Sequence, residues 1–201
     1  MRQLLAALLL MTPVLAATPA SAQTAGNAER GAVLADTCLG CHGIAGYRNA
    51  YPSYRVPKLG GQNADYVVAA LQGYRAQTRA HNTMHAQAAS MTDADIRDVA
   101  AYLASQGAPK AGAPVATAAA DKVATCAACH GEAGISPAPN WPNLAGQYVD
   151  YLEHAIRQYK SGARKDPVMG AQAQAIKDED IRLIAEHFAK QSGLYTVDYT
   201  D

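Results

Sequence analysis

Cys38-Leu39-Gly40-Cys41-His42 is the most informative run of this sequence, and Cys126-Ala127-Ala128-Cys129-His130 repeats its spacing later in the chain. Together the two pentapeptides use all 4 cysteines of the 201 residues. A Cys-x-x-Cys-His run is typical of covalent c-type haem attachment, in which two thiols bond to the porphyrin and the histidine binds its iron. The sequence therefore predicts two covalently bound haem c groups, attached through Cys38, Cys41, Cys126 and Cys129, with His42 and His130 as iron ligands.

Cys-x-x-Cys pairs also occur in thioredoxin-like redox sites and in zinc sites. In a zinc ribbon the two pairs lie roughly 15 to 20 residues apart. Here far more residues separate Cys41 from Cys126, and each pair is followed by its own histidine. This spacing favours haem, with a zinc site or a disulfide as the alternatives.

The N-terminus has the pattern of a secretory signal peptide. Arg2 precedes an apolar run over residues 4–15, and Ala20-Ser21-Ala22 is a small-x-small cleavage pattern. The run is shorter than the 18 or more apolar residues of a membrane helix, and no other segment approaches that length. We expect residues 1–22 to be removed, and the mature chain to be soluble, without a transmembrane segment, in the periplasm, where haem attachment takes place.

The rest of the chain is an internal repeat. Residues 57–62 (PKLGGQ) match residues 142–147 (PNLAGQ) at an offset of 85, and residues 93–97 (DADIR) match 178–182 (DEDIR) at the same offset. The haem motifs are 88 positions apart, so the first copy carries three extra residues between His42 and Pro57. This pattern indicates a duplicated haem-binding unit.

A Gly, Pro and Ala-rich stretch around residues 107–114 separates the two copies and is typical of a linker. We expect an N-terminal domain over residues 23–108, a linker over 109–120 and a C-terminal domain over 121–201.

The spacing of the apolar residues in both copies is helical. No segment alternates apolar and polar residues for long enough to form a strand. Ile96, Val99, Ala100 and Leu103 follow the i, i+3, i+4, i+7 spacing of one helix face, and the second copy repeats it from Ile181 to Phe188. Thr92 and Asp95 resemble a capping box, and Asn63 a helix N-cap. We expect an all-α fold with three helices around each haem.

The second axial ligand decides what a haem can do, because a six-coordinate iron transfers electrons whereas an open one binds small molecules. Met84 and Met169 match in the repeat, whereas Met91 matches Ile176. A ligand should recur in both copies, so we predict Met84 and Met169 as the second ligands. His81 and His85 flank Met84 but do not recur.

The charge is balanced, with 17 Lys and Arg against 17 Asp and Glu. Nucleic acid binding needs a basic face, so we expect no nucleic acid partner.

Two Cys-x-x-Cys-His units in one exported chain, each with a Pro-x-Leu-x-Gly-Gln segment, a later methionine and an Asp-x-Asp-Ile helix, resemble the cytochrome c4 family. The resemblance covers essentially the whole mature chain. It implies two tandem class I cytochrome c-like domains related by a pseudo-twofold axis, with His/Met ligation by His42 and Met84 and by His130 and Met169. The Tyr-rich segment 47–54 of the first copy departs from its shorter counterpart in the second.

The function that this resemblance implies is electron transfer, not catalysis. The expected protein is a monomeric respiratory-chain carrier whose redox partners are a quinol-oxidising cytochrome bc complex and a terminal oxidase. The alternatives are an electron-accepting subunit of a periplasmic dehydrogenase and a dihaem enzyme with one labile distal ligand.

Overall fold

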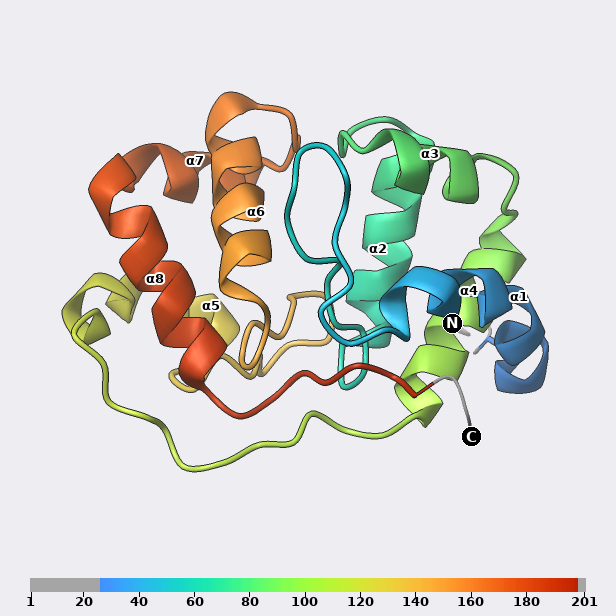
Figure 1. Ribbon diagram of the computed structural model, residues 1–201, viewed down its shortest axis with the longest axis horizontal. Coiled ribbons are helices and arrows are strands. Elements are labelled where there is room, and N and C mark those ends of the chain that lie inside the picture. The colour runs from blue at the N-terminus through green and yellow to red at the C-terminus, as the bar shows by residue number, and fades with distance from the viewer. Residues whose placement is uncertain (1–25, 199–201) are drawn as a thin grey trace, which may run out of the picture.

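A computed structural model of the chain describes residues 26–198, which form two helical domains side by side (Figure 1). The predicted signal peptide, residues 1–22, lies outside the described residues. Within 26–198 there is no β-strand, only three isolated bridges. The helices of the first domain are α1 (Ala28–His42), α2 (Ala64–Arg75), α3 (Asn82–Ala89) and α4 (Asp93–Ser105). Those of the second are the 3-10 turn η1 (Ala120–Lys122), α5 (Ala124–His130), α6 (Val149–Ser161), α7 (Pro167–Ala175) and α8 (Asp178–Lys190).

Each domain has one short helix more than the three expected. Helices α3 and α7 contain 8 and 9 residues and carry Met84 and Met169. Both begin at a side-chain cap: His81 Nδ1 accepts from the Met84 N–H, and Asp166 Oδ1 accepts from the Met169 N–H. Such short helices show almost no apolar periodicity, which is why the sequence pattern missed them.

Helix α1 packs closely against α4 because Gly31 lies at their crossing. A Cβ on Gly31 would stand 1.9 Å from the backbone oxygen of Asp98. Asn27 caps α1 by accepting from the Arg30 N–H, and its own N–H donates to Asp98 Oδ1 at 2.7 Å. The predicted capping box of α4, between Thr92 and Asp95, is present.

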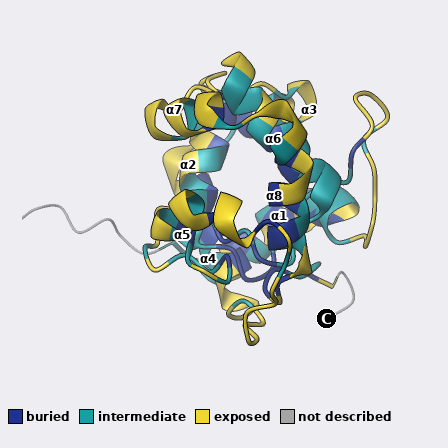
Figure 2. Ribbon diagram, turned by 90° about the vertical axis from the view of Figure 1, so that its left-hand side faces the viewer, coloured by how far each residue is buried: buried dark blue, intermediate teal, exposed yellow. Residues whose placement is uncertain are grey.

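The interior sides of the helices are buried and their outer faces exposed (Figure 2). The core of the first domain gathers around Ile96, Val99 and Leu103, and that of the second around Leu152, Ile184 and Phe188. No helix within residues 26–198 is long and apolar enough to cross a membrane.

The segment after α8 returns to the first domain (Figure 1). Gly60 and Tyr195 exchange backbone hydrogen bonds at 3.0 and 3.1 Å. Val197, at 2% exposure, belongs to the core of the first domain. The C-terminal segment therefore ties the two domains together.

The repeated Pro-x-Leu-x-Gly-Gln segments form a symmetric part of the domain interface. Gln62 Nε2 donates to the Asn143 carbonyl at 3.0 Å, and the Asn143 N–H donates to Gln62 Oε1 at 2.8 Å. Gln147 makes the equivalent pair of bonds with the backbone of Lys58, both at 3.0 Å. Since Gln62 matches Gln147 and Lys58 matches Asn143 at the same offset, these contacts follow a pseudo-twofold relation.

Asn63 precedes α2 but makes no side-chain cap there. Its Nδ2 donates instead to the Trp141 carbonyl at 2.7 Å, across the domain interface. Asn63 therefore holds the predicted N-cap position of α2 but makes no side-chain capping bond, because the interface offers its amide a partner from the other domain.

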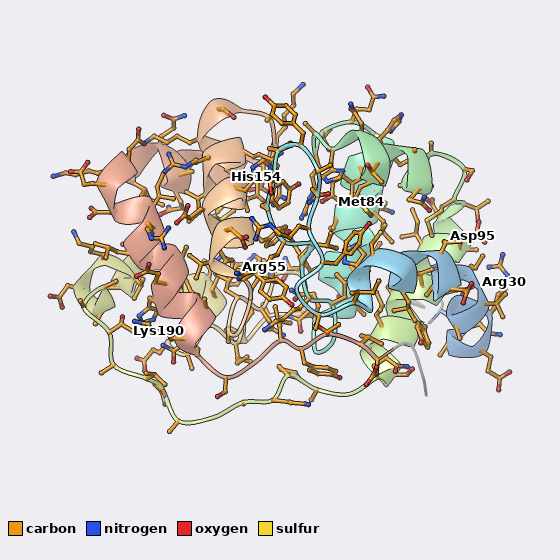
Figure 3. All side chains as sticks on the ribbon, viewed as in Figure 1. Arg30, Arg55, Met84, Asp95, His154 and Lys190 are labelled. Atoms are coloured by element: carbon orange, nitrogen blue, oxygen red, sulfur yellow. The ribbon has the colours of Figure 1, made fainter. Side chains whose placement is uncertain are left out.

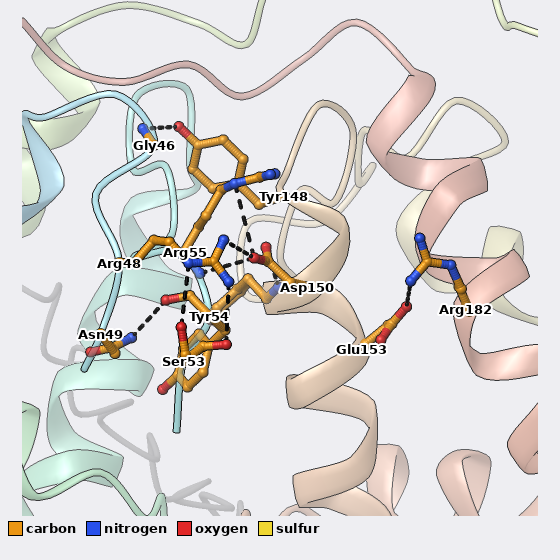
Figure 4. Close-up of polar contacts among 11 residues, drawn as sticks. Gly46, Arg48, Asn49, Ser53, Tyr54, Arg55, Tyr148, Asp150, Glu153 and Arg182 are labelled. Atoms are coloured by element: carbon orange, nitrogen blue, oxygen red, sulfur yellow. Dashed lines mark hydrogen bonds and ion pairs between the residues drawn. The ribbon is translucent and has the colours of Figure 1, made fainter. Parts of the chain in front are cut away.

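The extra residues of the first copy form a loop that reaches the second domain (Figure 4). We call residues 47–56 the insertion loop. Asp150 of α6 accepts from Arg48 Nη1 at 3.0 Å and from the Arg55 backbone N–H at 3.2 Å. Next to them, Tyr54 is buried at 5% exposure and stacks on His154, with ring centroids 4.1 Å apart.

Candidate functional site

A large cavity lies in each domain, and each of the two is lined by one set of the predicted haem residues. The first has a volume of about 640 Å³ and is lined by Cys38, Cys41, His42 and Met84. The second has a volume of about 610 Å³ and is lined by Cys126, Cys129, His130 and Met169. The structure thus brings the eight residues together in two groups of four.

The cysteines lie in the last turns of α1 and α5, four residues and one residue before each histidine. No disulfide joins any of these four cysteines in this structure, so that alternative does not hold here. Burial raises the pKa of Cys38 and of Cys126 above the ordinary thiol value. All four cysteine side chains are half-buried at the cavity walls, where they can bond to a haem.

Both histidines are held by a proline carbonyl of the repeated segment. His42 Nδ1 lies 2.8 Å from the Pro57 oxygen, and His130 Nδ1 lies 2.9 Å from the Pro142 oxygen. Such a contact places the proton on Nδ1 and leaves Nε2 as the nitrogen free to bind a metal. Burial lowers the pKa of both imidazoles, although the proline carbonyls oppose it. The neutral form, which is the one that ligates iron, is thereby favoured.

Met84 and Met169 are half-buried at equivalent cavity positions on α3 and α7. Figure 3 shows Met84 beside α2 and α3, on the opposite side of the interface from His154. The first cavity is also lined by Met91, whereas Ile176 takes that place in the second. The first cavity therefore offers two thioethers and the second offers one.

The remaining walls are mostly apolar, with Val67, Leu71 and Leu103 in the first cavity and Leu152, Ile156 and Phe188 in the second. Leaving a cavity unfilled costs on the order of 24 cal/mol per Å³. A large apolar group with a metal centre fits these residues, as a covalently attached haem would.

Four histidines lie outside the haem motifs, and one of them, His81, lines the first cavity and caps α3. His187 is buried and its Nδ1 lies 2.7 Å from the Thr117 hydroxyl, while His154 stacks on Tyr54. His85 Nδ1 lies 3.0 Å from the Tyr74 carbonyl.

Two arginines between the cavities were not singled out from the sequence. Arg79 and Arg164 are buried and pair through an antiparallel backbone bridge. A signal was present, because Arg79 matches Arg164 at the repeat offset, as Tyr66 matches Tyr151.

The profile of the cytochrome c family matches the chain twice, over residues 28–107 and 113–191. A protein described as a thiosulfate dehydrogenase electron acceptor, from Stutzerimonas stutzeri (strain A1501), is 33% identical, over 92% of this chain and 91% of the relative. A cytochrome c4 from Thiocapsa roseopersicina is 30% identical over 84% of this chain and 94% of its own. The crystal structure of reduced recombinant cytochrome c4 from Pseudomonas stutzeri superposes with a TM-score of 0.67 at 25% identity, covering 83% of this chain and all of that one.

Proposed function

The chain belongs to the cytochrome c4 family and binds two covalent haem c groups, and on that premise we propose that it carries electrons in the periplasm from a quinol-oxidising cytochrome bc complex toward a terminal oxidase. The observation that supports this role most directly is the equivalence of the two cavities. Each cavity is lined by one pair of cysteines, by the histidine that follows them, and by the methionine that matches in the repeat.

We propose that His42 and Met84 ligate one iron, and His130 and Met169 the other. A haem with these ligands supplies a one-electron couple whose potential is raised by the methionine. With imidazole and thioether both bound, neither cavity keeps a coordination position for a substrate. The protein then acts as a carrier, not as an enzyme.

The chain's own residues prepare the cavities for that task. The carbonyls of Pro57 and Pro142 orient the imidazoles, and the apolar walls exclude water, which tunes the potential of a metal centre. The cavities adjoin, since Tyr66, Arg79 and Tyr151 line both. Two redox centres are thereby held next to each other.

The test uses the purified holoprotein with membranes that contain each partner. We expect the oxidised protein to be reduced by quinol only when the bc complex is present, and the reduced protein to be reoxidised by the terminal oxidase. Failure of both reactions, with the two haems intact, would overturn the proposed path.

A second candidate is the electron acceptor of a periplasmic sulfur-compound dehydrogenase. The full-length similarity to a thiosulfate dehydrogenase electron acceptor favours it. Mixing the oxidised holoprotein with a thiosulfate dehydrogenase and thiosulfate tests this candidate. Reduction faster than by the bc complex would support the dehydrogenase as the physiological donor, whereas no reduction would exclude this role.

A further inference from the structure

The insertion loop is a short hairpin that the structure holds in place. The Val56 N–H donates to the Tyr47 carbonyl at 2.8 Å, and an antiparallel bridge pairs Arg48 with Arg55. The tip of the hairpin, residues 50–53, is exposed. Because the loop already has its backbone bonds, a protein that binds it has little chain to order, which lowers the cost of binding.

The loop and the turn before it carry a group of exposed apolar side chains. Tyr51 is 96% exposed, Ile44 is 50% exposed and Tyr47 is 43% exposed. Single exposed apolar residues are ordinary, whereas several in one short segment mark an interaction site. Tyrosine is also enriched in protein–protein interfaces.

Two arginines flank this group. Arg48 and Arg55 lie opposite each other in the bridge, and like charges directly opposite are destabilising. Both rely on one carboxylate, since Asp150 Oδ2 lies 3.0 Å from Arg48 Nη1 and 3.9 Å from Arg55 Nε (Figure 4). One carboxylate cannot balance two guanidiniums, and both remain partly exposed to solvent.

Lys58 adds a third cation to the same face. Its Nζ lies 4.8 Å from the centroid of the Tyr148 ring, and the Arg55 guanidinium lies 5.2 Å from the same centroid. Within residues 26–198, Lys58 forms no ion pair with an Asp or Glu. Three cations against one carboxylate leave an excess of positive charge, and such a face attracts acidic partners.

The repeat shows that this charge belongs to one side of the molecule. At the offset of 85, Asn140 takes the place of Arg55. Asn143 takes the place of Lys58, and only the carboxylate is kept, as Asp65. The corresponding segment of the second copy therefore lacks the excess of positive charge.

The insertion loop also forms a wall of the first cavity. Tyr47, Arg48 and Ala50 line that cavity and are exposed at the same time. A protein that binds the outer side of the loop is therefore separated from the first cavity by this loop alone. Electron transfer between proteins needs such a short separation.

We propose that the insertion loop, together with Lys58, is the docking surface for an acidic redox protein that exchanges electrons with the first haem. Carboxylates of the partner would pair with Arg48 and Arg55, and an apolar centre of the partner would pack on Tyr51. The proposal rests on the proposed function as an electron carrier. It needs no particular donor or acceptor.

The experiment follows the oxidation of the reduced holoprotein by plastocyanin, a small copper protein with an acidic face. One electron passes from a ferrous haem to Cu(II), which leaves a ferric haem and Cu(I). Stopped-flow absorption gives the second-order rate constant at low and high ionic strength for wild type, Arg55→Gln and Tyr51→Ser. Neither residue lines a cavity, so both variants should keep the haem spectrum of wild type.

Lys190→Gln is the control for net charge. Lys190 is exposed at the end of α8, in the second domain, and Figure 3 shows it apart from Arg55. A basic mitochondrial cytochrome c, used in place of plastocyanin, is the control for the sign of the charge.

We expect Arg55→Gln to lower the rate constant with plastocyanin by about threefold or more at low ionic strength, because a charged face raises association rates about 10- to 1000-fold. At high ionic strength this difference should disappear, since salt screens exposed charges. Tyr51→Ser should lower the rate constant at both ionic strengths. Lys190→Gln should keep the wild-type rate, and Arg55→Gln should not slow the reaction with the basic cytochrome.

Wild-type rates in both Arg55→Gln and Tyr51→Ser would overturn the docking surface and leave the carrier function standing. If neither protein oxidises the reduced wild type, the carrier function itself fails. If Arg55→Gln loses a haem, Tyr51→Ser alone decides.

Sedimentation of the wild-type holoprotein tests two other occupants of this face. A dimer that Tyr51→Ser dissociates would assign the face to a second copy of the chain. Binding to phosphatidylglycerol vesicles that Arg55→Gln abolishes would assign it to an anionic membrane. Either result would overturn the proposal.

Discussion

Gln62 and Asn143 exchange two hydrogen bonds across the domain interface, from the Gln62 amide to the Asn143 carbonyl and from the Asn143 N–H back to Gln62 Oε1. Gln147 repeats the arrangement with Lys58. The residue before Lys58 is Pro57, and the residue before Asn143 is Pro142. The carbonyl of each proline accepts a hydrogen bond from the histidine of the haem motif in the same copy. The same short segment therefore orients the imidazole and joins the domains.

Replacing Gln62 with Ala removes both bonds and leaves buried backbone groups of Asn143 without these partners. A buried unsatisfied polar group costs about 1–3 kcal/mol. We expect Gln62→Ala to lower the free energy of unfolding by that amount, measured by guanidinium denaturation of the holoprotein. Gln147→Ala should behave alike and the exposed Gln72→Ala should not. Equal stabilities of Gln62→Ala and Gln72→Ala would show that this interface contributes little.

Tyr54 anchors the insertion loop on the second domain through its ring. The ring is buried and stacked on His154, and the structure shows no hydrogen bond from the Tyr54 hydroxyl to another described residue. Tyr54→Ala should therefore cost about 3 kcal/mol of stability, and Tyr54→Phe less than about 1 kcal/mol. A thermal or denaturant unfolding series measures both. A Phe variant as unstable as the Ala variant would assign the anchor to the hydroxyl instead.

Met84 and Met91 both line the first cavity, so the repeat alone distinguishes them. We expect Met84→Leu to remove the sulfur-to-iron charge-transfer band of one haem. Met91→Leu should leave that band unchanged, because its counterpart in the second cavity is Ile176. Absorption spectra of the oxidised variants at equal haem content make the comparison. Loss of the band in Met91→Leu would instead make Met91 the iron ligand and Met84 a residue of the cavity wall.

The two-domain helical architecture and the grouping of the haem residues could be predicted, because the repeat and the haem motifs are local patterns. Other features depend on contacts between distant residues. The placement of Asn63 across the interface, the stacking of Tyr54 on His154 and the return of Val197 to the first core show no signature in a single segment. Arg79 and Arg164 could have been noticed from the repeat, but their burial between the cavities could not.

Asp95 makes the first domain sensitive to acid. Hydrogen bonds from the Thr92 side chain and backbone, and then from Arg30, lower the pKa of Asp95 from 3.8 to about 2. Figure 3 shows Arg30 and Asp95 together at the outer edge of the first domain. Because the folded-state value is the lower one, the stabilisation is complete above about pH 4 and is lost as the pH falls toward about 2.

We therefore expect wild type to lose more stability than Asp95→Asn between about pH 5 and about pH 2.5. Urea midpoints of both proteins at the two pH values measure the difference. Asp65→Asn, which removes an exposed carboxyl from the first turn of α2, is the control. Identical pH dependence of Asp95→Asn and wild type would contradict the role of this cap.

We propose that both irons carry an imidazole and a thioether, which makes the protein an electron carrier. The most direct test is the absorption spectrum of the oxidised wild-type holoprotein, with the sulfur-to-iron charge-transfer band quantified per haem. We expect a band equivalent to two methionine-ligated haems and no high-spin features. One band or none, together with high-spin features, would contradict the claim and would indicate a dihaem enzyme with an open or labile distal position.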